Sequence, residues 1–204
     1  MTSLANRRSA ILLFSLPDSL HSHRTRLVIK EKEISAELHE VDINNISEEI
    51  KFISPYDDFP TLVDRELVLQ NSRVIIEYLD ERFPHPPLLP VDPVARAKFR
   101  LALDRIEHQW YPEFNKAYQN GKLEDSFVDQ IKSYFIEIIP LINDSFFMSE
   151  DFGLVDCSLA PLLWRIKSLG VDMAENKQTI DNYSERIFSR ESFQASLTET
   201  EQDM

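Results

Sequence analysis

The sequence predicts a protein of two domains, an α/β domain followed by an all-helical domain, and three observations predict it. Up to residue 83, short strand-like runs alternate with helical patterns in the order β-α-β-α-β-β-α. Beyond residue 92, every long apolar pattern has the helical period. Between them lies Pro-His-Pro-Pro-Leu-Leu-Pro, which cannot continue a helix because proline lacks the N–H donor and restricts the residue before it. We therefore place the domains at residues 1–83 and 93–204, with a proline-rich linker at 84–92.

The elements of the first domain follow from short patterns bounded by turn residues. Strands are expected where apolar and β-branched residues form brief runs, the last two joined as a hairpin at Asp64-Arg65: residues 9–15, 37–42 and 59–69. Helices are expected where apolar residues recur at helical spacing: residues 22–33, 47–52, and a helix that opens at Asn71 or Ser72 and runs through Phe83. Ser47 is the expected N-cap of the short helix, because its hydroxyl can accept an unpaired backbone N–H.

The second domain opens with Asp92-Pro93, an N-cap followed by proline at the first helical position. Helices are expected over four apolar patterns: residues 94–118, 124–147, 155–168 and 177–189. Pro112 and Pro140 should kink or divide the first two of these helices. The tail from Thr198 to Met204 is polar, and we expect it to fray.

Composition and charge exclude several classes of function. The net charge is −13, from 22 basic and 35 acidic side chains, so direct binding of nucleic acid is not expected, whereas a partner with a basic surface would be attracted. The chain has 3 glycines and no glycine-rich phosphate-binding pattern. The single cysteine, Cys157, excludes an internal disulfide and fits a reducing compartment. The apolar run before Pro17 is too short for a signal segment and reads as a buried strand. We therefore expect a cytoplasmic protein without a membrane span.

Three local features make the chain resemble the glutathione transferase superfamily, in which a thioredoxin-like domain precedes a helical one. Pro60 stands before the hairpin, where that family has a cis-proline, and Asn71-Ser72 stands where the family has an acidic residue or Gln followed by Ser. Asp156 matches the family's buried helix start in the second domain. The resemblance covers roughly residues 9–197 and implies a glutathione transferase-like fold.

Three longer segments, residues 61–67, 77–88 and 154–165, resemble a bacterial branch of this superfamily whose members associate with RNA polymerase. That resemblance implies a regulator of transcription under starvation or stress. Its implied partners are RNA polymerase holoenzyme, through the core or a sigma factor, and a second chain in a homodimer or in a dimer with a related chain.

A working transferase needs a Tyr, Ser or Cys near the start of the first helix to lower the thiol pKa of glutathione. Ser19 and Ser22 are the candidates here, although serine at this place is also a good helix N-cap. The neutral Asn71 cannot pair with the amino group of the γ-glutamyl moiety, so Pro60, Asn71 and Ser72 read as a vestigial glutathione pocket. We expect no enzymatic activity and no cofactor; a glutathione-dependent transferase or reductase is the alternative.

The linker is the expected partner-binding surface. The residues Pro84, His85, Pro86 and Pro87 would be stiff before binding, and Tyr78 would add apolar area, although the composition also fits a plain linker.

The remaining candidates read as structural. At a buried helix start the carboxylate of Asp156 can accept backbone N–H groups, while Gly153 replaces the usual capping Ser or Thr. His21 and His23 are two residues apart, so a helix would point them in different directions, and no metal site is expected. Cys157 reads as a small core residue, with a reactive thiol as the alternative.

Overall fold

A computed structural model describes residues 10–119, 122–142, 145–171 and 177–204. The chain divides into two compact units, one reaching Pro86 and completed by Ala195–Asp203, the other formed by Pro87–Gln194 and Met204. The break between the units falls inside the expected linker. The last residues differ from the expected division, because 195–203 join the first unit instead of the helical one.

The first unit contains a mixed sheet and the expected order of elements, with a further short helix from the end of the chain. Its elements are β1 (Ile11–Ser15), α1 (Leu20–Glu31), β2 (Ala36–Glu40), α2 (Glu48–Ile53), β3 (Thr61–Asp64), β4 (Leu67–Leu69), α3 (Ser72–Arg82) and α10 (Glu199–Gln202). Ser47 caps α2 as predicted, by accepting the backbone N–H of Ile50. Ser9, the first residue of the predicted opening strand, lies outside the described residues.

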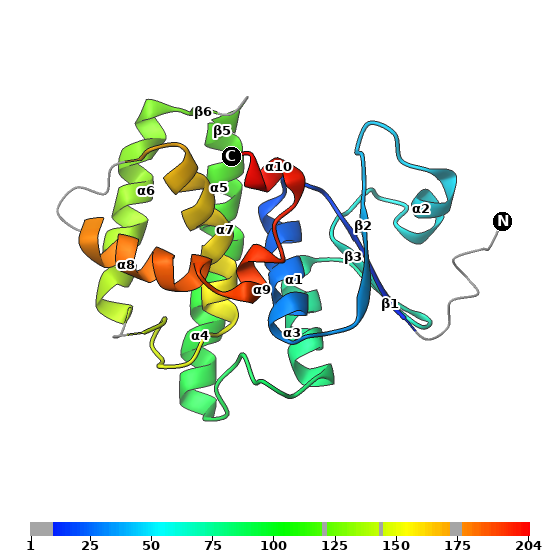
Figure 1. Ribbon diagram of the computed structural model, residues 1–204, viewed down its shortest axis with the longest axis horizontal. Coiled ribbons are helices and arrows are strands. Elements are labelled where there is room, and N and C mark those ends of the chain that lie inside the picture. Colours follow the sequence, from blue (N-terminus) through cyan, green and yellow to red (C-terminus); the bar gives the residue numbers. More distant parts are fainter. Residues whose placement is uncertain (1–9, 120–121, 143–144, 172–176) are drawn as a thin grey trace. The chain divides into compact units, whose positions relative to one another are not determined.

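The sheet has the order β2-β1-β3-β4, with β1 and β2 parallel and the other pairs antiparallel. Figure 1 shows α1 and α3 on one face of this sheet and α2 on the other. The central strand β1 is buried throughout because both of its faces are covered. Leu12 and Phe14 pack in a cluster with Val41 and Phe59. This arrangement is that of a thioredoxin-like domain.

The second unit is mainly helical, and its irregular helical turns lie near Pro112 and Pro140, where the sequence predicts a kink or a break. Its elements are α4 (Pro93–Arg105), the π-helical turn η2 (Ile106–Trp110), α5 (Tyr111–Ala117), β5 (Tyr118–Gln119), β6 (Lys122–Leu123), α6 (Asp125–Ile138), the 3-10 turn η3 (Ile139–Leu141), α7 (Leu154–Ser168), α8 (Lys177–Phe188) and α9 (Glu191–Gln194). Pro112 lies in the first turn of α5 and Pro140 lies in η3, so the predicted division of the first two helices is confirmed.

One helix of this unit is shorter than expected, and one pair of short strands was not predicted. The second predicted helix, α6, does not continue to residue 147. After η3, Ile142 and Phe147 pair as an isolated β-bridge. Residues 143 and 144 lie outside the described residues. The strands β5 and β6 lie between the first two predicted helices, and only Tyr118 falls within a range that was expected to be helical. Strands of two residues are too short to show an apolar periodicity in the sequence, so they could not be predicted.

The polar tail does not fray. Thr198 and Glu201 cap α10 reciprocally, and Glu201 is fully buried. Its carboxylate lies 2.7 Å from the Arg26 guanidinium and 3.2 Å from Nδ1 of His23, both on α1. Figure 1 shows α10 beside α1. The polar side chain of Glu201 pairs with buried charged groups on α1. Composition alone does not reveal those partners, so the tail was expected to fray.

The start of α7 is organised by Asp156, in the way the sequence predicts. Its buried carboxylate accepts the backbone N–H groups of Gly153 at 2.8 Å and Phe147 at 2.9 Å, and the hydroxyl of Tyr183 at 2.6 Å. Burial raises the pKa of Asp156 from 3.8 to about 6, against the lowering effect of these three hydrogen bonds. Cys157 follows and is completely buried, as expected of a core residue.

Gly153 lacks a capping side chain because there is no space for one. A Cβ at this position would lie 2.9 Å from the carbonyl oxygen of Leu88 and 3.3 Å from the Phe99 ring. The same Leu88 oxygen accepts the N–H of Leu154 at 2.9 Å, so the backbone cannot move away without losing a bond. Close approach of backbone, and not a positive φ, therefore selects glycine here.

Restoring the common cap by Gly153→Ser should destabilise the protein. Overpacking against a fixed carbonyl costs roughly 1–3 kcal/mol, which exceeds the gain of about 1 kcal/mol from a serine cap. Urea unfolding measures the difference. Glu124→Ser is the matched control, because Glu124 is the exposed N-cap of α6 and makes no side-chain cap bond; this variant should be as stable as the wild type or more so. A stabilised Gly153→Ser protein would contradict the steric explanation.

The raised pKa of Asp156 predicts a specific pH dependence. Because its folded-state value of about 6 lies above the ordinary 3.8, the stability contributed by this group is complete below about pH 4 and is lost as the pH rises through 6. The difference corresponds to roughly 3 kcal/mol. Urea unfolding between about pH 4 and pH 7.5 should show this loss in the wild type and not in Asp156→Asn, which lacks the titrating carboxyl. Parallel pH profiles of the two proteins would show the assignment to be wrong.

Candidate functional site

The start of α1 holds both candidate catalytic serines, Ser19 just before the helix and Ser22 in its first turn, and each hydroxyl oxygen accepts a backbone hydrogen bond. Ser19 is the N-cap of α1, where its Oγ accepts the N–H of Ser22 at 3.3 Å. Ser22 is fully buried, and its Oγ accepts the N–H of Leu16 at 3.0 Å. Ser19 therefore acts as the cap that the sequence allowed, and Ser22 fixes the loop from inside.

Ser72 joins two basic side chains of α1 that the sequence did not single out. Its hydroxyl accepts Nε of Arg24 at 3.1 Å and Nη2 of Arg24 at 2.5 Å, and Nδ1 of His21 lies 2.9 Å away. Arg24 is completely buried and Ser72 is nearly so. The serine of the expected glutathione pocket is thus bonded within the protein.

The other two residues of that pocket are also structural. Asn71 has a φ of 73°, a left-handed conformation that asparagine tolerates, and its side-chain oxygen accepts the N–H groups of Arg73 and Val74. The peptide bond between Phe59 and Pro60 is cis, as the family resemblance predicts. The backbone at Pro60 therefore has the expected geometry, while the Asn71 oxygen is used to cap α3.

The C-terminal segment holds the same loop from outside. The Arg26 guanidinium donates to the carbonyl of Leu16 at 3.1 Å and to that of Ser196 at 2.9 Å. The hydroxyl of Thr198 donates to the carbonyl of Pro17 at 2.8 Å. The loop is thus held through two of its own carbonyls, those of Leu16 and Pro17.

The expected docking segment is exposed and held from beneath. Pro84, His85, Pro86 and Pro87 are all exposed. The ammonium of Lys32 donates to the carbonyl of Pro86 at 2.6 Å and to the carboxylate of Asp80 at 2.7 Å. The Lys32 side chain is completely buried, so this contact is shielded from water. A second cis bond joins His85 to Pro86, a geometry that the sequence did not predict.

The surroundings of this segment change the expected role of Tyr78. Tyr78 is half-buried, and its hydroxyl donates to Asp64 at 2.7 Å. Burial, followed by that hydrogen bond, raises the pKa of Tyr78 above 10.0. Phe83 is half-buried, and the guanidinium of Arg82 lies 5.3 Å from its ring centre. Asp80 is buried against Lys32 and does not present its charge to a partner.

The histidines point to separate partners, His21 to Ser72 and His23 to Glu201. In the described ranges, no group of three or more His, Cys, Asp or Glu side chains could hold a metal ion. None of the described helices is both long and apolar enough to cross a bilayer.

Sequence reasoning missed Lys32 and Arg24, the buried side chains that bond the docking segment and Ser72. Their partners are Asp80 and Ser72, each 48 positions away in the sequence. A lysine at the end of an amphipathic helix has the same local signature whether it faces water or a buried carboxylate. A comparison of paired substitutions between homologous sequences is the signal that would find such pairs.

Comparisons with known proteins agree on the fold and the family. The profile of the glutathione S-transferase N-terminal domain matches residues 13–87. A glutathione transferase Omega 3C of Trametes versicolor superposes with a TM-score of 0.81 at 21% identity, covering 96% of this chain and 93% of that one. A glutathione-bound maleylacetoacetate isomerase of Anaeromyxobacter dehalogenans superposes with a TM-score of 0.73 at 22% identity, covering 93% and 96%. At these identities the likeness concerns the fold alone.

Relatives with higher sequence identity identify the branch. Stringent starvation protein A homologues of Pasteurella multocida and Haemophilus influenzae are 48% and 47% identical, covering 97% and 98% of this chain and 94% and 95% of their own lengths. The homologue of Coxiella burnetii is 45% identical over 97% of this chain and 96% of its own length. On this evidence the chain belongs to the stringent starvation protein A family, a branch of the glutathione transferase superfamily.

Proposed function

We propose that this protein is a cytoplasmic, RNA polymerase-associated regulator of transcription under starvation or stress, built on a glutathione transferase fold without transferase activity. The family name of its relatives supports the link to starvation. The acidic chain favours a basic protein surface as partner and disfavours direct contact with DNA.

The observation that carries the proposal is the fixed and exposed segment from Pro84 to Pro86. Proline restricts the backbone before binding, so that docking costs little conformational entropy. The bond from Lys32 to the Pro86 carbonyl fixes the segment further, from a position that a partner cannot reach. An exposed imidazole, that of His85, is thereby presented on a rigid support.

The absence of transferase activity is supported by the bonding of the serines. Ser19 caps a helix, Ser22 is buried, and Ser72 is bonded to Arg24. A hydroxyl that activates the glutathione thiol must donate to it and must be reachable, and a γ-glutamyl carboxylate would have to displace Arg24 from Ser72.

A second chain is also part of the proposal, as a homodimer or as a dimer with a related chain. Apolar side chains of α3 and α4, Val74 and Val94, are half or more exposed, which favours a protein surface as their cover.

With glutathione and a generic aryl halide, the purified protein should show no turnover above the uncatalysed rate. The physical reasons are the burial of Ser22, the bonding of Ser72 to Arg24 and the use of the Asn71 oxygen to cap α3. A conjugation assay measures the rate, and calorimetry tests for glutathione binding separately. Turnover that disappears in both Ser19→Ala and Ser22→Ala would restore the enzyme as the function.

Replacing Pro84, His85 and Pro86 together by alanine should lower the affinity for RNA polymerase holoenzyme at least tenfold. The fold and the dimer should remain, because exposed substitutions usually change stability by about 0.5 kcal/mol or less. Fluorescence anisotropy of labelled protein measures binding, and sedimentation measures the dimer. The matched control replaces the exposed Pro55 and Tyr56 by alanine.

A second variant distinguishes between a docking surface fixed from beneath and a plain linker. The double variant Lys32→Met/Asp80→Leu removes both buried charges, so that neither remains unpaired, and keeps all three docking residues. It should fold and yet bind polymerase more weakly than the wild type. If the triple-alanine variant binds normally, the segment is only a linker; if the wild type itself does not bind, the proposed function fails.

A further inference from the structure

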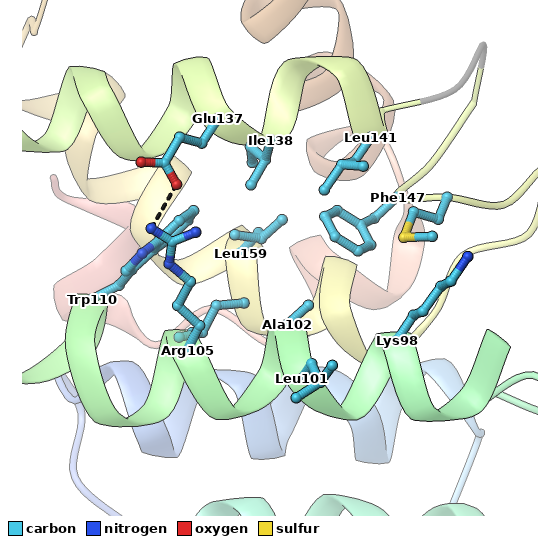
Figure 2. A pocket seen from close by; sticks show the side chains of 12 residues that line it. Lys98, Leu101, Ala102, Arg105, Trp110, Glu137, Ile138, Leu141, Phe147 and Leu159 are labelled. Carbon is cyan, nitrogen blue, oxygen red and sulfur yellow. Dashed lines mark ion pairs between the residues drawn. The ribbon is translucent and has the colours of Figure 1, made fainter. Parts of the chain in front are cut away.

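The helical unit contains an open pocket of about 610 Å³ that the proposed function does not use. Its size lies within the usual range for small-molecule sites, roughly 300–1,000 Å³. The walls are mainly apolar side chains of α4, α6 and α7, among them Leu101, Ala102, Ile138 and Leu159. Figure 2 shows these side chains around the space between α4 and α6.

The pocket lies where two helices lose regular α geometry. α4 passes into the π-helical turn η2, whose first and last residues, Ile106 and Trp110, both line the pocket. α6 ends in the 3-10 turn η3, which places Leu141 in the wall. π-Helical turns inside helices occur frequently at functional sites. Residues of both irregular turns, η2 and η3, thus contribute to the wall of the same pocket.

One end of the pocket carries a buried donor without a partner. Trp110 is 3% exposed, and its Nε1 makes no hydrogen bond among the described residues. The ring is held in place by stacking on Tyr134, with ring centres 5.0 Å apart. An unsatisfied buried N–H costs roughly 1–3 kcal/mol. Because this N–H is itself inaccessible, a ligand in the pocket would contact the Trp110 ring and not its donor. Figure 2 shows Trp110 at the same end as Arg105 and Glu137.

The charges at the pocket favour an anion. Arg105 lies 2.5 Å from Glu137, but each side chain is about half exposed, and such a pair contributes little stability and can exchange partners. Lys98 stands two turns earlier on α4, about 10 Å away along the helix, at the other end of the pocket (Figure 2). Two cations against one carboxylate, on a chain with a net charge of −13, leave a local excess of positive charge.

We propose that this pocket binds a small amphipathic carboxylate, with its apolar chain along α4 and its carboxylate at Arg105. The apolar walls take the chain, Arg105 provides a charge-assisted bond, and Glu137 competes with the ligand for the same guanidinium. The proposal concerns the helical unit alone and does not depend on polymerase binding.

Calorimetry with decanoate as the probe tests the proposal on the full chain, with decanol as the uncharged match. Decanoate should bind saturably with one site per chain. Arg105→Gln should weaken decanoate about tenfold and leave decanol unchanged. Glu137→Gln should instead strengthen decanoate several-fold, because it releases Arg105. Both variants break the same ion pair, so a merely structural role of that pair would move both affinities in the same direction and would overturn the proposal.

Two further variants locate the site. Ala102→Phe fills the pocket without touching a charge and should abolish binding of both probes, while the exposed Lys177→Gln on α8 should change nothing. In a Trp164→Phe background Trp110 is the remaining tryptophan, and its emission should shift with the calorimetric midpoint. Unchanged binding in Ala102→Phe, or decanoate affinity that falls as protein concentration rises because a second copy fills the pocket, would overturn the assignment.

Discussion

The buried ammonium of Lys32 connects three parts of the first unit that are distant in sequence. It stands at the end of α1, neutralises Asp80 on α3 and holds the carbonyl of Pro86. A buried charge is costly unless it is paired and fully hydrogen-bonded, and here two strong acceptors satisfy it. The position of the exposed prolines is thus determined from the interior of the domain, so their presentation depends on correct packing of α1 against α3.

Much of the fold could be predicted from the sequence because local chemistry and global structure agree. Strand and helix order, the Ser47 cap, the division at Pro112 and Pro140, and the role of Asp156 all follow from patterns within a few residues. The failures have a different cause. The tail from Thr198 onward is polar because Glu201 meets Arg26 and His23, and pairing across more than 170 positions leaves no local pattern.

The candidate sites show the same division. From the sequence, a serine before a helix can be either an N-cap or a catalytic residue. Only the structure shows that the Ser19 oxygen accepts the Ser22 N–H. The sequence identified Ser72 but not Arg24, which occupies its hydroxyl. The pocket beside α4 was not predicted at all, since it arises from the geometry of two irregular turns and from a tryptophan that reads as ordinary packing.

The membership of residues 195–203 in the first unit has a consequence for the order of folding during synthesis. Domains generally fold as they leave the ribosome, the N-terminal one first. Here α1 carries Arg26 and His23, whose partner Glu201 is made only after the whole helical unit. Until then the α1 charges and the Ser19 loop lack the contacts that bury them, so the nascent first unit remains unfinished while the second is translated. The first unit is therefore completed only after residues 87–194 of the second have been translated, although most of its own sequence precedes them.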